Sequence, residues 1–301
     1  MPELSVLANY GDLCGEGPIW DVTARRLYWT DITGQKFYCY DWMSRKHWLV
    51  KEGWEIAGAA FNRPGGFVVA NSSGVWLWDG AGEPRLVAEQ GEGSKCQLND
   101  CIADPAGRLL AGSVFYDPTS KDYPLGKLIR VDTDGTAHVL DEGNHLANGL
   151  GFSVDAKTLY FTDSAARIIY AYDYEPKSGN ARHRRVFVKV PATSGLPDGL
   201  TVDAEDFVWS AEWYGSRVVR YDRDGKIERT IETPAKQTSS LAFGGPDLMD
   251  IFITSAAKSE PMPIMPPGYD PNTGNFGGAL YHINLGIRGK AEFVANISVE
   301  N

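Results

Sequence analysis

Short apolar and aromatic runs separated by turn residues recur along the whole chain, and stretches with helical periodicity are few. The clearest copies of the pattern are residues 18–41 and residues 200–222. Each copy reads as a strand, a turn, a second strand, a turn, and a third strand that ends on an aromatic residue followed by Asp. The pattern predicts antiparallel β-structure built from a repeated unit.

The first turn of this unit can be located six times along the chain. The six anchor residues are Asp21, Asn62, Asp104, Ser153, Asp203 and Gly244. Their spacings of 41, 42, 49, 50 and 41 residues match the length of a four-stranded propeller blade. A single four-stranded sheet cannot bury both faces, whereas a closed ring of sheets buries them against neighbours. The sequence therefore predicts an all-β, six-bladed β-propeller that forms one domain over residues 1–301.

A propeller ring must be closed by pairing between the two ends of the chain. We expect an N-terminal strand near Ser5–Ala8 and a C-terminal strand near Ala291–Ala295 to lie in the same blade.

Composition and charge support this architecture and exclude several partners. Nine Trp, fourteen Tyr and twelve Phe suit strands, and 33 Gly and 17 Pro suit the turns between them. The net charge of -10 argues against a nucleic-acid partner. No apolar run approaches the roughly 20 residues needed to cross a bilayer, and the start of the chain lacks the pattern of a signal peptide. We expect a cytoplasmic monomer or weak homo-oligomer with no membrane partner.

The residues five places before the six anchors form a second series. In a propeller they lie where the chain enters each innermost strand, so all six should surround one mouth of the central channel. The series is Glu16, Ala57, Asn99, Asn148, Asp198 and Ser239. An isolated Asn or Asp before Gly is typically a turn residue. Four oxygen-bearing side chains in one register instead indicate a cage for a hard cation.

Two carboxylates and two amides suit calcium or another oxygen-preferring divalent ion. Cys14, Cys96 and Cys101 lie near these positions in sequence and leave a softer metal open. We expect these cysteines and Cys39 to be reduced thiols, although a Cys96–Cys101 pair is an alternative.

These residues carry a family resemblance that extends over nearly the full chain. The chain resembles the senescence-marker/gluconolactonase/luciferin-regenerating family. The matching stretches, in order and in phase with six blades, are residues 15–20, 98–100, 104–108, 148–150, 197–199 and 243–247.

The resemblance implies a single divalent ion on the axis of a six-bladed propeller. Ca²⁺ is the first expectation, with Zn²⁺, Mn²⁺, Mg²⁺ and Fe²⁺ as alternatives. The family's metal ligands would fall on Glu16, Asn148 and Asp198, with Asn99 as a ligand or a substrate contact. Asp198 also inherits the role of general base, and the activity implied is hydrolysis of a sugar lactone. Many members of the family carry Arg two residues before the Asn that corresponds to Asn99, and this chain has Gln97 there. Gln lacks the charged guanidinium group of Arg but can still form hydrogen bonds.

Two mechanisms are compatible with these residues. The metal could polarise the lactone carbonyl while Asp198 takes a proton from water, or a metal-bound hydroxide could attack while Asp198 only positions it. A Ser-His-Asp hydrolase is disfavoured because the chain lacks a Gly-x-Ser-x-Gly elbow. His145 lies three residues before Asn148 and is either a substrate contact or a hydrogen-bonded loop residue.

Two long loops, residues 115–125 and 259–274, should emerge on the same face as the metal. The candidates for the substrate pocket wall are Tyr116, Tyr123, Met262, Met265, Tyr269, Trp54 and Trp213. Two further functions stay open: a related hydrolase that acts on non-sugar lactones or esters, and a metal-binding propeller without catalysis.

Overall fold

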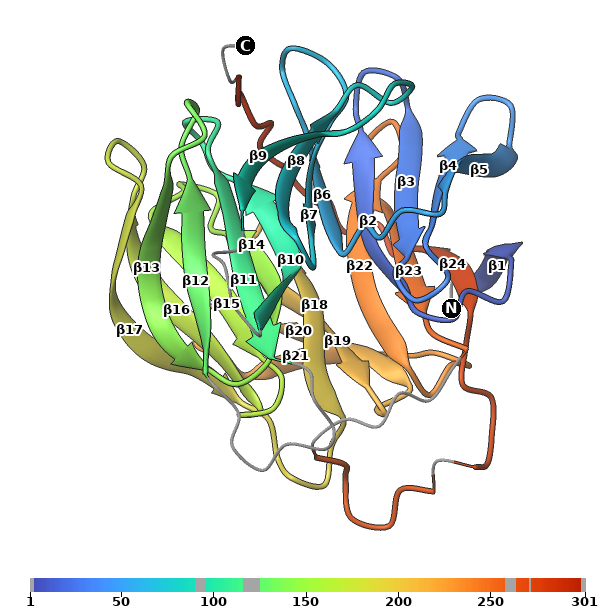
Figure 1. Cartoon of the computed structure of the whole chain (residues 1–301). Coiled ribbons are helices and arrows are strands. Elements are labelled where there is room, and N and C mark those ends of the chain that lie inside the picture. The colour runs from blue at the N-terminus through green and yellow to red at the C-terminus, as the bar shows by residue number, and fades with distance from the viewer. Residues whose placement is uncertain (1–2, 90–95, 116–124, 258–263, 271, 299–301) are drawn as a thin grey trace.

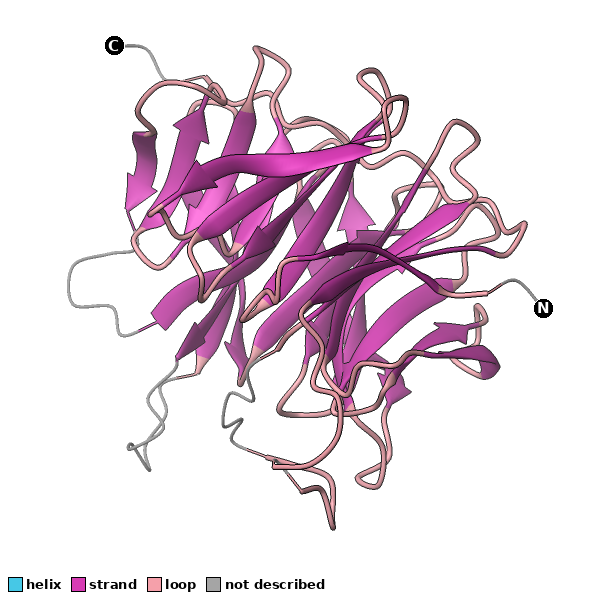
Figure 2. Ribbon diagram, turned by 90° about the vertical axis from the view of Figure 1, so that its right-hand side faces the viewer, coloured by secondary structure: helices cyan, strands magenta, loops and turns pink. Residues whose placement is uncertain are grey.

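Six separate four-stranded antiparallel sheets make up the computed structural model, which describes residues 3–89, 96–115, 125–257, 264–270 and 272–298. The described residues contain strands, turns and loops but no helix (Figures 1 and 2). No helix in this part of the chain could therefore cross a membrane. The sheets are arranged as the predicted six-bladed β-propeller.

The first four strands after the closing strand form blade 1, and each later blade follows in chain order. Blades 1 to 3 consist of β2 (Gly15–Asp21), β3 (Arg26–Asp31), β4 (Lys36–Asp41) and β5 (Lys46–Glu52); β6 (Gly58–Phe61), β7 (Phe67–Asn71), β8 (Gly74–Trp78) and β9 (Arg85–Glu89); and β10 (Cys96–Ala103), β11 (Leu109–Phe115), β12 (Gly126–Val131) and β13 (Ala137–Asn144).

Blades 4 to 6 repeat this arrangement, except that the last blade takes its outermost strand from the N-terminus. They consist of β14 (Ala147–Phe152), β15 (Thr158–Asp163), β16 (Ile168–Glu175) and β17 (Asn180–Lys189); β18 (Leu196–Val202), β19 (Val208–Trp213), β20 (Arg217–Tyr221) and β21 (Ile227–Glu232); and β22 (Thr238–Gly244), β23 (Asp250–Ser255), β24 (Ala279–Asn284) and β1 (Ser5–Asn9).

The innermost strands of the six blades form a closed ring. Each of them, from β2 to β22, contacts the innermost strand of both neighbouring blades. All six predicted anchors lie at the last residue of an innermost strand or directly after it. Hydrophobic clusters fill the spaces between blades, as where Leu110 of blade 3 packs with Phe152 and Phe161 of blade 4. This burial between sheets is the stabilisation that a lone blade would lack.

Five of the six innermost strands are irregular near the point where they begin. In β2, β10, β14, β18 and β22 the register with the second strand shifts, which marks a β-bulge or a similar irregularity. A bulge adds a residue on one strand and redirects a side chain. The shifts fall around the predicted ring positions, from Glu16 to Ser239.

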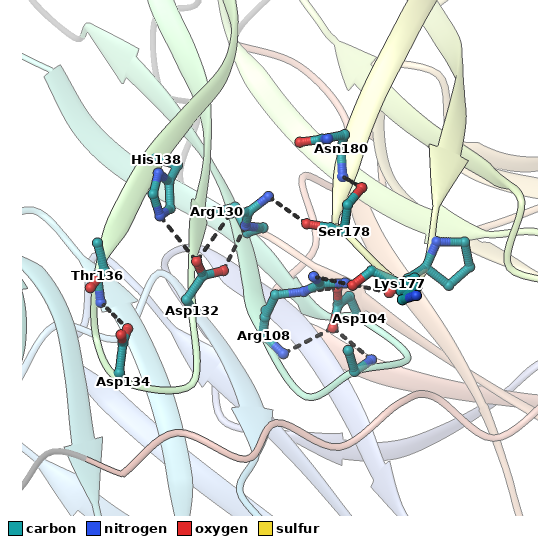
Figure 3. Close-up of polar contacts among 12 residues, drawn as sticks. Asp104, Arg108, Arg130, Asp132, Asp134, Thr136, His138, Lys177, Ser178 and Asn180 are labelled. Atoms are coloured by element: carbon teal, nitrogen blue, oxygen red, sulfur yellow. Dashed lines mark hydrogen bonds and ion pairs between the residues drawn. The ribbon is translucent and has the colours of Figure 1, made fainter.

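Buried arginines join blade 3 to blade 4 at the end of the ring where the anchors lie. Arg108 pairs with buried Asp104 and donates to the carbonyl of Pro176, 2.6 Å away. Arg130 pairs with Asp132 and donates to the carbonyl of Ser178 at 3.0 Å. Figure 3 shows both guanidinium groups directed at the turn between β16 and β17. Each arginine thus satisfies carbonyls that the turn leaves unpaired.

The ring is closed by β1, which pairs antiparallel with β24. The expectation of a closing strand at Ala291–Ala295 is wrong, because these residues form no strand and the last strand is β24. β24 already pairs with β1 on one side and β23 on the other, so no further strand can pair with it.

Residues 286–298 instead run across the turns at the anchor end of the ring. Ala295 exchanges backbone hydrogen bonds with Phe61 and Arg63, and the Asn62 side chain bonds to Ile297 in both directions at 3.0 Å. Ala295 and Ile297 are fully buried between blades. The last described residues of the chain lie at this end of the ring, drawn in dark red at the top of Figure 1.

A buried carboxylate, Asp12, lies in the connection between β1 and β2. Its Oδ2 accepts from Trp29 Nε1 at 3.0 Å, and its Oδ1 has no hydrogen-bond partner. Its backbone bonds to Gly278 and Ala257, which ties the closing segment to blade 6. Burial, with nearby Asp31 as a smaller cause, raises the pKa of Asp12 from 3.8 to about 7.

We predict that Asp12→Asn flattens the pH dependence of stability. The folded-state pKa lies above the unfolded value, so the unfolded chain releases this proton first and stability falls between about pH 4 and pH 7. The wild type should lose roughly 4 kcal/mol relative to the variant across this window, and the difference should stay constant above it. Urea unfolding of both proteins at several pH values measures the difference. Parallel profiles would contradict the assignment.

Candidate functional site

The four predicted oxygen-bearing side chains meet at one cavity. Glu16, Asn99, Asn148 and Asp198 all line a cavity of about 370 Å³ at the mouth of the ring opposite the anchors. They come from four different innermost strands, β2, β10, β14 and β18. Asp198 and Asn148 are buried, at 2% and 6% exposure. The other two members of the series, Ala57 and Ser239, do not line this cavity.

The N–H groups of the two amides donate hydrogen bonds within the protein. Asn99 Nδ2 donates to the Ala147 carbonyl at 2.9 Å and to Asn148 Oδ1 at 3.3 Å. Asn148 Nδ2 donates to Ser164 Oγ at 3.2 Å. Asn148 Oδ1 accepts the bond from Asn99 and, as an amide oxygen with two lone pairs, can accept a further contact.

Negative charge is concentrated around this mouth. Burial, and then the charge of Asp100, raises the pKa of Glu16 to about 8. Burial raises the pKa of Asp100 to about 6. Burial also raises the pKa of Asp198 well above its usual value, the charges of Glu16 and Asp100 add to the rise, and the Asn148 side chain opposes it. Asp198 Oδ1 is buried without a hydrogen-bond partner. The cluster favours a cation.

The described part of the chain contains no group of three or more His, Cys, Asp or Glu side chains arranged to hold a metal. Any metal at this mouth would therefore have to use a mixed set of carboxylate and amide oxygens. Cys14 lines the same cavity, and Cys101 is a free thiol, so the Cys96–Cys101 disulfide is not formed. The side chain of Cys96 lies outside the described residues.

Further residues form the cavity wall above this ring. Gln97 and Trp213, both predicted to contact substrate, line it. The sequence analysis missed Thr33, Gln35 and Glu55, which line it as well. The signal that could have revealed Glu55 is its register, because it lies two residues before Ala57 as Gln97 lies two residues before Asn99.

Other predicted wall residues lie elsewhere. His145 is exposed and sits 3.2 Å from the Asp163 carboxylate, outside the cavity lining. Trp54 packs against Trp76 and Trp78 of blade 2. Met265 is exposed, and Tyr269 packs behind Trp213. The last two belong to the loop drawn in orange-red at the lower edge of Figure 1. Three predicted wall residues lie outside the described residues: Tyr116, Tyr123 and Met262.

Comparison with known proteins identifies the family. Residues 14–257 match the family model described as SMP-30/Gluconolactonase/LRE-like region. The chain belongs to this family.

Individual relatives agree with this assignment. The chain is 37% identical to pentonolactonase XacC of Haloferax volcanii, over 94% of each chain. A solved luciferin-regenerating enzyme is 27% identical, with a TM-score of 0.88 over 99% of this chain and 100% of that one. The calcium-binding protein regucalcin of Agrobacterium tumefaciens is 25% identical, with a TM-score of 0.84 over 96% of both. These matches place the chain among sugar lactone hydrolases.

We predict that Gly149→Ala damages the site and the fold together. A Cβ at Gly149 would lie 2.2 Å from the backbone N of Leu200 in the neighbouring blade, so the two innermost strands would have to separate. The free energy of unfolding should fall by about 1–3 kcal/mol, the range for overpacking a core. Urea unfolding measures the loss. Gly82→Ala is the control, since its nearest contact is an ordinary 3.4 Å. Equal stability of both variants would contradict the packing argument.

Proposed function

We propose that this chain hydrolyses an aldonolactone to the aldonic acid at the Glu16–Asp198 mouth, with one divalent cation bound there. The observation that carries the proposal is the buried Asp198 carboxylate, whose Oδ1 lacks a partner and which lies beside two further carboxylates. The similarity to a pentonolactonase supports the choice of a sugar lactone as substrate.

The residues present fit a hard cation. Glu16 and Asp198 supply charge, and the inward oxygens of Asn148 and Asn99 complete an all-oxygen set suited to Ca²⁺. Similarity to a calcium-binding regucalcin points the same way. Mn²⁺, Mg²⁺, Zn²⁺ and Fe²⁺ are the alternatives. When bound, such an ion acts as a Lewis acid that polarises the lactone carbonyl.

Asp198 acts as the general base. Its burial raises its pKa, so without a neighbouring positive charge the carboxyl would hold its proton. A cation nearby favours the ionised form, which leaves Oδ1 able to take a proton from the attacking water. The same group can then return the proton to the ring oxygen as the ester bond breaks. Asn148 holds the carboxylate in position through its hydrogen bond.

We predict that Asp198→Asn lowers lactone turnover by at least about a hundredfold, because it removes the proton acceptor. Glu16→Gln should weaken metal binding by about tenfold or more, because it removes one carboxylate charge. Acid release from pentono- and hexonolactones, followed with a pH indicator, measures turnover. Metal-stripped protein is assayed with each divalent ion in turn, and calorimetry measures the binding of the ion.

The control for both variants is Glu52→Gln, an exposed carboxylate at the end of β5. Unchanged turnover and metal affinity in the two site variants would refute the site. Metal binding without hydrolysis of any lactone or simple ester would instead support a binding propeller, as the similarity to regucalcin allows.

A further inference from the structure

A second ring of positions lies two residues before the first ring, further out along the mouth. Its members are Cys14, Glu55, Gln97, Leu146, Leu196 and Gln237. Four of them line the cavity: Cys14, Glu55, Gln97 and Leu146. The first ring gathers the oxygens proposed to hold the cation, so the second ring is the part of the mouth that a bound substrate would face.

The two sides of this outer ring differ in polarity. Glu55 and Gln97 belong to neighbouring blades 2 and 3, and Gln35 lies beside them in the lining. Leu146 and Trp213 come from blades 4 and 5, with Leu196 and Tyr269 packed around Trp213. Because the six blades follow one another around the ring, blade 2 lies across the mouth from blade 5. The cavity therefore has a wall that carries the polar side chains, together with Ile32 and Val114, and an apolar wall opposite.

Glu55 is held in position on the polar wall. Its Oε2 accepts a hydrogen bond from the Ser72 hydroxyl. Its backbone carbonyl accepts from Asn71 Nδ2 at 3.2 Å, and Asn71 is itself buried, with Oδ1 bonded to Trp76 Nε1 at 3.1 Å. Glu55 Oε1 makes no hydrogen bond with the described residues. Glu55, which lines the cavity, thus keeps one carboxylate oxygen able to accept from a hydroxyl.

The charge of Glu55 has no counter-charge in the described lining. That lining carries the carboxylates of Glu16, Asp198 and Glu55 and no Lys, Arg or His. A divalent cation would balance Glu16 and Asp198, which leaves Glu55 as a net negative charge beside the substrate. A like charge on the substrate would be repelled in this partly enclosed space.

We propose that Glu55, with Gln97, selects a neutral polyhydroxylated lactone and excludes lactones that carry an anionic substituent. This inference rests on the proposed function. The substrate's hydroxyls bond to Glu55 and Gln97, while its C–H face packs against Leu146 and Trp213. A ligand with both a polar edge and an apolar face matches the two walls of the cavity.

The test compares a neutral hexonolactone with the same lactone oxidised to a carboxylate at its terminal carbon. We expect the wild type to prefer the neutral lactone. Glu55→Gln keeps the size of the side chain and removes its charge, so the ratio of the two kcat/KM values should fall by about tenfold. Glu52→Gln, exposed and outside the cavity, should leave the ratio unchanged.

A binding measurement separates this inference from the proposed function. A non-hydrolysable anhydroalditol and its terminal carboxylate are titrated by calorimetry into metal-loaded wild type and Glu55→Gln. Selectivity for the neutral analogue that disappears in the variant supports the inference, even if no lactone is hydrolysed. Hydrolysis with a neutral-to-anionic ratio that is the same in the wild type and Glu55→Gln overturns the inference and leaves the lactonase intact. Equal binding of both analogues to the wild type also overturns it.

Discussion

Neighbouring innermost strands approach so closely around the axis that only glycine fits where some of them meet. An added Cβ would lie 2.2 Å from Leu200 N at Gly149 and 2.1 Å from Ser240 Oγ at Gly199. The register shifts in β14 and β18 fall at these same positions. The side chains directly before the glycines, Asn148 and Asp198, therefore face the cavity at the axis. The site depends on strand packing, which is rigid, and not on loops.

The electrostatics of the axis differ from those of the rest of the propeller. Several buried carboxylates elsewhere have cationic partners, as Asp104 has Arg108 and Asp203 has Arg220 at 2.7 Å, and Asp12 is an exception. The carboxylate of Asp198 has two neighbouring carboxylates instead, and its pKa rises. A buried carboxylate without a cationic partner costs free energy, so the group either keeps its proton or is balanced by a bound cation. Perturbed acids gathered in a cavity are a frequent mark of function.

The repeat could be predicted from sequence because each blade ends its innermost strand on a local turn. The anchors at Asp21 and Asp203 accept hydrogen bonds from backbone N–H groups within the next four residues, so the signal is short-range. The N-terminal strand that closes the ring could be predicted, but its C-terminal partner could not, since the pairing of β1 with β24 joins distant segments. The apolar residues of 291–295 look like a strand, yet they cross the turns of other blades, where Ala295 is buried and Phe293 is half-buried.

The candidate metal ligands could be recognised from the sequence, because each is an Asn or an acidic residue at the same position of the repeat and three of them precede Gly. Glu55 had no such signal in the sequence, because blade 2 has Ala57 at the position of the candidate ligands and its innermost strand is regular. Only alignment of blade 2 with blade 3 relates Glu55 to Gln97. The two rings also differ in how freely they can vary. First-ring residues sit at irregular points of packed strands, whereas Glu55 precedes β6 and lies outside the sheet ladder. Substitution of Glu55 can therefore leave the inner ring undisturbed, so under the proposed model it changes substrate selection alone.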